Sequence, residues 1–342
     1  MTVPLCSIVI PTFNGRALLE VCLASVKNHS PQDIPIEVVV ADDGSTDATE
    51  AWLGSRYPEV RVVRLEENKG FCVAANAGIA AARGEFIQLL NNDTEVTPGW
   101  IEAGLAPFQD PKVGSVAPLV LVRSDPDRVD SAGDTYSFVG WPCKRGHGEP
   151  SRDWFERPTD RVFGASGSSA FYRSSALRKV GGFDAAFGSY YEDIDLAFRL
   201  RWAGYDCIFT PKSRILHEVS ASYDHAHADL QRRMSRNAET LFWTDLPGPW
   251  LAAAIVPHLA FISGQSLRRL LQGRIAPFLL GKLDALRDWH NLAGRRRLRK
   301  DLAMAGVSTP HFPINFGLLR DVRNHIGRPR EATSLSRLPP PR

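Results

Sequence analysis

The sequence predicts an α/β protein with a mostly parallel central sheet, helices on both faces and a C-terminal helical extension. One observation is a set of short apolar runs rich in β-branched residues, at 7–11, 38–41, 60–65 and 86–90. Another is the helical spacing of apolar residues between these runs, as in 18–26. Strands that alternate with helices form βαβ units, and these units place their strands parallel in one sheet.

The distribution of charge divides the chain into two unequal parts. With 342 residues, 44% of them hydrophobic and 23% charged, the chain fits one large soluble domain or a domain with an appendage. Residues 250–342 carry 16 Lys and Arg against 5 Asp and Glu, whereas the preceding residues carry 25 against 33. An acidic body with a basic tail predicts that the tail meets an anionic partner.

The tail combines apolar and basic residues. Its apolar run 251–262 contains Pro257 and, at about a dozen residues, is too short to span a bilayer. The following mixture, with the basic run 295–300, fits helices in a membrane interface, a helical cap on the catalytic domain, or a dimer partner. Nucleic acid is disfavoured because no recognition motif accompanies the charge. The predicted domains are a catalytic unit 1–245 (halves 1–117 and 118–245), a helical basic extension 246–330 and a disordered tail 331–342.

The cysteines and the N-terminus predict a cytoplasmic protein. The five cysteines are odd in number, scattered, and mostly within apolar runs, as expected for reduced buried thiols. The first residues lead directly into a strand, without the basic and apolar segments of a signal peptide.

Polar residues follow the fourth apolar run. The run 86–90 predicts a buried strand, and Asn91, Asn92 and Asp93 come directly after it. Ligands collect at the carboxyl ends of such strands. A carboxylate with open coordination positions suits Mg²⁺ or Mn²⁺, although an ordinary Asn-Asp turn is the alternative.

Seven motifs in order carry a family resemblance. They are PTFNG, VVADDGSTD, ENKGFCVAANAG, LLNNDTEV, FGASGSSAFYR, GGFDAAFGSYYEDIDLAFRLRWAGY and LHEVSAS. Together they make roughly residues 5–245 resemble glycosyltransferase family 2, which has the GT-A fold. Within this family the chain is most similar to the bacterial branch that includes rhamnosyltransferases of cell-surface polysaccharides.

The resemblance implies donor-binding positions at three strand ends and one helix start. They are Pro11, Thr12, Asn14, Asp43, Asn68, Lys69, Asn91 and Asn92. For Asn68 and Lys69, which open a helix, contact with phosphate and a surface helix cap are both open. Turn and capping chemistry is the favoured interpretation of Asp42 and Asp47, but not of Asp43.

The resemblance also implies a metal site. The family motif has two aspartates flanking one residue, and here Asn91 replaces the first while Asp93 remains. His217, after an apolar pair, is either a second metal ligand or a structural histidine. The expected cofactor is Mg²⁺ or Mn²⁺, bound together with the donor and acting as a Lewis acid on the leaving nucleoside diphosphate.

On the acceptor side, the resemblance assigns the general base to Asp193 and an acceptor hydrogen bond to Glu192. Both fall in the first turn of a helix and are expected to point away from its buried face. The helix dipole is expected to lower the pKa of Asp193. The alternative is that these acids only stabilise the helix start.

Two further residues are predicted to meet the acceptor. Trp141, in an irregular segment, either stacks on a sugar or packs locally. Gly167 lies in a run of small residues that permits close approach of a ligand to the backbone.

The resemblance implies an inverting, metal-dependent glycosyltransferase of polysaccharide synthesis. The donor would be a nucleoside-diphosphate sugar, with dTDP-rhamnose or a UDP-sugar as the expectation, and the acceptor a glycan or polyprenyl-linked hydroxyl. The inner face of the cell membrane and a homodimer are compatible settings. The alternatives are a nucleotidyltransferase, for which residues 11–16 match a triphosphate loop poorly, and an inactive carbohydrate-binding or scaffold subunit.

Overall fold

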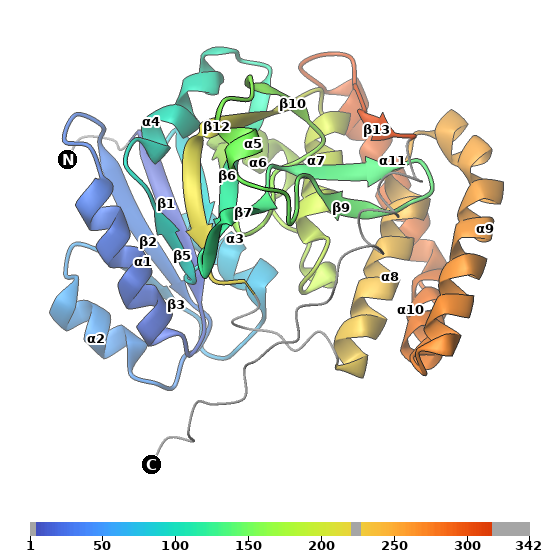
Figure 1. Ribbon diagram of the computed structural model, residues 1–342, viewed down its shortest axis with the longest axis horizontal. Helices are drawn as coiled ribbons and strands as arrows, with labels where there is room; N and C mark the ends of the chain where they lie inside the picture. Colours follow the sequence, from blue (N-terminus) through green and yellow to red (C-terminus); the bar gives the residue numbers. More distant parts are fainter. Residues whose placement is uncertain (1–4, 220–226, 317–342) are drawn as a thin grey trace.

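The computed structural model describes residues 5–219 and 227–316, and its centre is a twisted sheet in the order β10-β12-β6-β11-β4-β1-β2-β3 (Figure 1). Its strands, with β5 and β7 paired at the side, are β1 (Cys6–Thr12), β2 (Ile36–Asp42), β3 (Arg61–Arg64), β4 (Phe86–Leu90), β5 (Thr94–Val96), β6 (Val113–Val122), β7 (Asp125–Ser131), β10 (Asp160–Val162), β11 (Ser169–Arg173) and β12 (Asp206–His217). Strands β3, β2, β1 and β4 are parallel, which confirms the predicted βαβ half.

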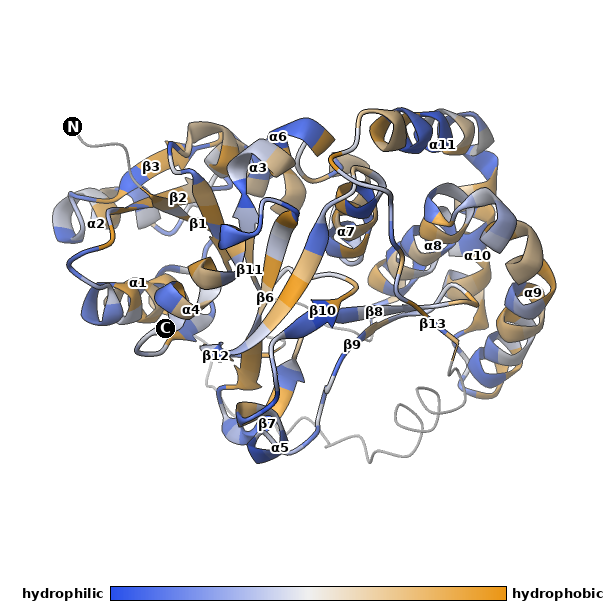
Figure 2. Cartoon of the chain, turned by 90° about the horizontal axis from the view of Figure 1, so that it is seen from above, coloured by the Kyte–Doolittle hydropathy of each residue, from blue (hydrophilic) through white to orange (hydrophobic). Residues whose placement is uncertain are grey.

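Helices cover both faces of the sheet. On one face lie α1 (Arg16–His29), α2 (Thr49–Arg56) and α4 (Trp100–Leu105), and on the other lie α3 (Phe71–Ala81), α6 (Ser174–Val180) and α7 (Glu192–Trp202) (Figure 2). The chain reverses its direction of travel across the sheet between β3 and β4, and right-handed crossovers therefore place α3 opposite α1 and α2. The five cysteines are free, and only Cys143 is partly exposed.

The second half of the sheet is mixed. Strand β11 runs antiparallel between β4 and β6, whereas β12 is parallel to β6. Between β10 and β11, the run of small residues that contains Gly167 leaves the sheet and forms a loop at the site. A second, small sheet contains β8 (Asp134–Ser137), β9 (Pro142–Lys144) and β13 (Ile314–Asn315), and the short helix α5 (Arg152–Phe155) follows β9.

Four helices form a layer beyond α7. They are α8 (Ala228–Asp245), α9 (Gly248–Leu271), α10 (Ile275–Arg287) and α11 (Trp289–Met304). Helix α8 packs against α10, α11 contacts both α7 and α8, and β13 pairs with β8. The expected boundary at residue 245 coincides with the end of α8. The helices beyond it pack on the catalytic part, because α10 contacts α8 and α11 contacts α7 and α8. The expected disordered tail 331–342 lies outside the described residues.

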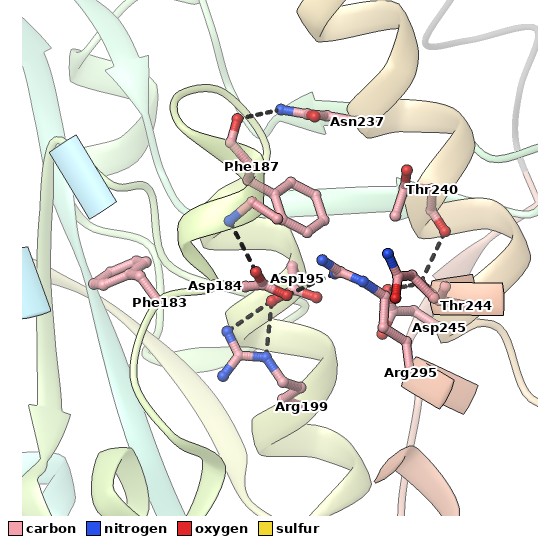
Figure 3. A network of polar contacts seen from close by, with 12 residues as sticks. Phe183, Asp184, Phe187, Asp195, Arg199, Asn237, Thr240, Thr244, Asp245 and Arg295 are labelled. Carbon is pink, nitrogen blue, oxygen red and sulfur yellow. Dashed lines mark hydrogen bonds and ion pairs between the residues drawn. The ribbon is translucent and has the colours of Figure 1, made fainter. Parts of the chain in front are cut away.

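The basic run 295–300 is partly internal, as expected if this part of the tail is a helical cap on the catalytic domain. Arg299 is 3% exposed and donates to Asp195 and Asp245 over 2.6 Å each. Arg295 pairs with Asp184 at 2.7 Å. Figure 3 shows part of this region, with Asp195 joined to Arg199 of the same helix α7 and with Asp184, Asp245 and Arg295 nearby. Arg295 and Arg299 therefore attach α11 to the catalytic part.

Helix α9 is longer than the sequence predicted. It continues through Pro257 for 24 residues. Within the described part of the chain it is the helix long and apolar enough to cross a membrane by length and composition. The expectation that this segment is too short is wrong because the proline does not end the helix.

Candidate active site

The carboxyl ends of β1, β2 and β4 bring the predicted donor residues together. Pro11 is buried and lies opposite Ala41 in the parallel register of β1 and β2. Thr12, the last residue of β1, accepts a 2.8 Å hydrogen bond from the Asn92 side chain through Oγ1, and its carbonyl accepts from the Asp43 amide. This edge of the sheet is where open α/β sheets bind ligands.

The turns after β1 and β2 are joined by Asn14. Its backbone is in the left-handed region at φ 48°, its amide donates to the Ser45 hydroxyl at 2.9 Å, and its side-chain oxygen accepts from the Thr46 amide at 2.8 Å. Asn14 itself is exposed. The two turns therefore form one rigid, solvent-facing rim.

Asp43 attaches the start of α3 to this rim. Its two carboxylate oxygens accept from the amides of Lys69 and Gly70 at 2.7 and 2.8 Å, and the residue is 3% exposed. The capping chemistry that the sequence suggested for other aspartates is thus also made by Asp43. Asn68 and the Lys69 side chain are exposed beside it, and donor contact by these three residues stays a prediction.

Strand pairing sets His217 beside Asp93. His217 is the last residue of β12 and lies opposite Thr94 of β5, so its Nε2 comes within 3.4 Å of Asp93 Oδ1. That oxygen is buried and has no hydrogen-bond partner among the described residues. A buried carboxylate oxygen left without a donor, facing an imidazole nitrogen, is a donor set that a divalent cation fits.

Asp130 and Lys144 hold the histidine from behind. His217 Nδ1 lies 3.0 Å from Asp130 Oδ2, and Lys144 Nζ lies 2.9 Å from both oxygens of that fully buried carboxylate. A carboxylate on the far nitrogen fixes the ring and its tautomer, as it does for histidines that bind metals. Burial opposes the charge on His217, but the hydrogen bond to Asp130 and the negative charges of Asp130 and Asp93 raise the pKa of His217 to about 9.

Asp193 lies at the start of α7, whose N-cap Tyr191 has a positive φ. Its Oδ2 accepts from the Gly167 amide at 2.9 Å, and its Oδ1 accepts from the Ile194 amide at 2.8 Å. The side chain is partly exposed, unlike most of α7. Burial by the surrounding protein raises the pKa of Asp193 despite these two amides, so the dipole-based expectation of a lowered pKa is wrong.

Glu192 is buried, which corrects the expectation that it points away from the packed face of α7. It is 7% exposed, and its Oε2 has no hydrogen-bond partner within the described chain. Burial, and then the charge of Asp193, raise the pKa of Glu192 well above its usual value. A raised pKa favours the protonated carboxyl, which can donate a hydrogen bond as well as accept one.

A loop of small residues joins the donor and acceptor sides. Gly167 donates to Asp193, while the next carbonyl, that of Ser168, accepts from the Asn91 amide at 3.0 Å. A Cβ at Gly167 would lie 3.4 Å from oxygens of both Asp193 and Glu192. This loop therefore connects Asp193 to the turn that carries Asp93.

The sequence did not identify Asp130, Asp134 and Lys144. Asp134 is 3% exposed, its Oδ2 has no partner among the described residues, and it lies opposite Lys144 in the pairing of β8 and β9. Burial, followed by the charge of Asp193, raises the pKa of Asp134 well above its usual value. The signal available along the sequence was two aspartates, Asp130 and Asp134, on either side of a short run of small residues.

Trp141 packs on the helical layer. Its ring meets Phe261 of α9 edge-on, with centroids 5.2 Å apart, and its amide donates to the Ser137 hydroxyl. The packing alternative is therefore realised, and contact with an acceptor sugar stays a prediction.

Comparison with known proteins decides the family. The family model described as glycosyl transferase family 2 matches residues 7–181. The chain belongs to glycosyltransferase family 2. It is 34% identical over 239 residues to an N-acetylglucosaminyl-diphospho-decaprenol L-rhamnosyltransferase of Mycobacterium tuberculosis H37Rv, covering 63% of this chain and 76% of the relative. The protein is therefore a rhamnosyltransferase-like enzyme of this family, and the nucleotidyltransferase and scaffold alternatives are set aside.

Solved structures identify the fold as GT-A. The complex of GalNAc-T7 with UDP, GalNAc and Mn²⁺ has a TM-score of 0.55 at 18% identity, and the match covers 70% of the present protein and 48% of the GalNAc-T7 chain. S. aureus TarS 1–349 with UDP has a TM-score of 0.54 at 17% identity, covering 91% and 96%. The predicted GT-A architecture with a C-terminal helical region is confirmed.

Proposed function

We propose that this glycosyltransferase moves a sugar, with inversion, from a nucleoside-diphosphate donor to a hydroxyl of a lipid-linked or other glycan acceptor. The relative named as an N-acetylglucosaminyl-diphospho-decaprenol L-rhamnosyltransferase supports a lipid-linked acceptor and a deoxyhexose donor such as dTDP-rhamnose. The likeness to UDP complexes keeps a UDP-sugar as the second donor. The cytoplasmic face of the membrane, where such an acceptor would be met, is the proposed location.

Asp193 is the proposed base, and one observation carries this assignment. Its carboxylate is partly exposed, held by two backbone amides in a fixed orientation, and has a raised pKa. A base whose pKa rises toward the working pH takes a proton more effectively. Asp193 would take the proton of the acceptor hydroxyl, whose oxygen then forms the bond to the anomeric carbon as the nucleoside diphosphate leaves from the opposite side.

Asp93 and His217 are the proposed metal ligands. Among the described residues no group of three or more His, Cys, Asp or Glu could hold a metal, so diphosphate oxygens and water would complete the coordination shell. Mg²⁺ or Mn²⁺ bound there supplies Lewis-acid stabilisation of the leaving diphosphate. Asp130 keeps the ring of His217 in position, and Asp93 presents a buried oxygen 3.4 Å from Nε2 of that ring.

The remaining positions bind the two substrates in this proposal. Thr12, Asn14, Asp43 and Asn92 form the donor rim. Glu192, whose pKa is raised by burial and by the charge of Asp193, is suited to hydrogen-bond an acceptor hydroxyl next to Asp193.

The decisive experiment separates transfer from donor binding. Asp193→Asn is expected to lower turnover by about 10²–10⁴-fold while the affinity for the donor nucleotide changes little. Asp153→Asn, on the exposed surface of α5, is the matched control and should leave both unchanged. An Asp193→Asn enzyme that keeps most of its turnover would show that another group is the base.

The metal role has its own test. Calorimetric titration of the nucleoside diphosphate should show tighter binding with Mn²⁺ than with EDTA in the wild type, and this difference should disappear in Asp93→Ala. Equal affinity with and without Mn²⁺ in the wild type contradicts the metal site. A panel of nucleotide sugars, compared by thermal shift with Mn²⁺, then identifies the donor.

A further inference from the structure

Two neighbouring helices, α9 and α10, expose an unusual number of large apolar side chains. Nine of the fifteen exposed large hydrophobic residues in the described part of the chain belong to α9 and α10, with exposed fractions from 40% to 81%. We name this set the leucine face: Val256, Leu259, Leu267, Leu270, Leu271, Leu279, Leu280, Leu283 and Leu286. A soluble monomer rarely leaves so many apolar side chains together in water. Figures 1 and 2 show the two helices side by side, at the end of the molecule away from β1–β3.

The opposite side of α9 is attached to the protein by His258. The imidazole is 2% exposed, its Nδ1 lies 2.7 Å from the Val139 carbonyl, and its Nε2 lies 3.2 Å from Glu239 Oε1. The ring also stacks on Phe242 with centroids 3.5 Å apart. If α9 left this position to cross a bilayer, Glu239 would lose one of its buried partners, which is strongly unfavourable. The helix therefore lies along a surface although its length would allow a span.

The charge near the leucine face is positive. Residues 248–287 contain five Lys and Arg but only one acid, Asp284, which is paired with Arg232 at 2.6 Å. Arg268 and Arg274, near the junction of α9 and α10, have no side-chain partner among the described residues. A second copy of the chain, related by a two-fold axis, would place these arginines against the same positive surface. Anionic lipid headgroups complement both the charge and the apolar side chains.

We infer that α9 and α10 dock in the plane of an anionic bilayer, with the leucine face among the acyl chains and Arg268 and Arg274 at the headgroups. The inference rests on the proposed function only in taking the acceptor to be lipid-linked. The docking has a use there, because the segment that carries Trp141 rests on α9 through the Val139–His258 contact and the Trp141–Phe261 ring pair. The acceptor half thus lies next to the lipid-facing helix.

The test uses the full chain and vesicles in a co-sedimentation assay. The wild type is expected to bind vesicles of phosphatidylcholine with phosphatidylglycerol about tenfold more tightly than phosphatidylcholine alone. Arg268→Glu with Arg274→Glu should remove that preference, and Leu267→Glu with Leu271→Glu should abolish binding to both. These side chains are exposed, so the changes leave the core intact. Met304→Glu, an equally exposed apolar residue on α11, is the control and should bind like the wild type.

Three outcomes would overturn the inference. One is a wild type that binds neither type of vesicle. Another is a leucine-face variant that still binds the vesicles. The same holds for a variant whose only change is from dimer to monomer, as measured by light scattering. The third is a wild type that alkaline carbonate cannot extract from vesicles, since this would mean that α9 spans. The proposed function is tested separately, by sugar transfer to a short-chain N-acetylglucosaminyl diphosphate acceptor without vesicles. If the wild type shows no transfer, the proposed function fails but the docking result stands. If the leucine-face variant still transfers the sugar, docking is separate from the chemistry.

Discussion

Arg299→Met removes a cation that two fully buried carboxylates share. Arg299 donates to Asp195 of α7 and Asp245 of α8 over 2.6 Å each, and methionine keeps most of the apolar stem but not the charge. Asp195 keeps its pair with Arg199 at 2.6 Å, so the loss falls mainly on Asp245, which retains the hydroxyl of Thr244 at 2.7 Å. Removing one partner of a buried pair costs about 3–5 kcal/mol.

That loss is large beside the ~5–15 kcal/mol that stabilises a typical protein. It is measured from the midpoint and slope of urea unfolding, followed by tryptophan fluorescence. Arg297→Met, at an exposed position on the same helix, is the control and should change the free energy of unfolding by less than about 0.5 kcal/mol. Adding Asp245→Asn to Arg299→Met should recover part of the loss, because the amide leaves no unpaired charge. The reasoning is refuted if Arg299→Met costs no more than Arg297→Met.

Further predictions concern the metal site, acid stability and helix packing. Asp130→Asn should weaken Mn²⁺-dependent nucleotide binding about 10–100-fold through the loosened ring of His217, with EDTA-treated binding unchanged in the same calorimetric titration. Burial opposes the charge of Glu239, but its buried histidine and lysine partners lower its pKa to about 2. This stabilisation is present above pH 4.5 and is lost as the pH falls toward 2. Glu239→Gln should therefore lower the free energy of unfolding by roughly 3 kcal/mol at pH 7 and flatten its pH dependence on the acid side. An unchanged pH dependence would contradict the assignment. Gly281→Ala, whose Cβ would lie 2.3 Å from a carbonyl of α8, should cost about 1–3 kcal/mol in urea unfolding, while Gly264→Ala, with open space around it, should be neutral or stabilising.

The nucleotide half could be predicted from sequence because its rules are local. Apolar runs define the strands, and parallel topology brings Thr12, Asp43 and Asn91 to one edge wherever the helices between them lie. His217 and Asp130 are different, since 87 residues separate them and the irregular pairing of β6 with β7 sets their contact. No pattern along the chain reports such a contact. The buried acids behind the site were missed for this reason.

Burial changes what two charged segments of the sequence mean. The lowered pKa expected for Asp193 was wrong because it assumed a solvated helix end, whereas α7 is packed on nearly all sides and burial dominates. For the basic run 295–300 the sequence left several partners open, and in the structure Arg295 and Arg299 pair with Asp184, Asp195 and Asp245 of the same chain. Composition gives the sign of a charge, and only the fold gives its environment.

Arg299 of α11 also limits which segments of this enzyme can be exchanged with those of its relatives. The family match ends at residue 181, but beyond it Arg299 binds both Asp245 and Asp195, the latter 104 residues away in the sequence. Exchanging the last helices between homologues, for example to change the acceptor, would bring in a foreign side chain at one corner of this triad. Chimeras should fold only where all three residues come from the same parent. The junction of a chimera should therefore be chosen to keep this triad intact and not simply be placed at residue 181, where the family match ends.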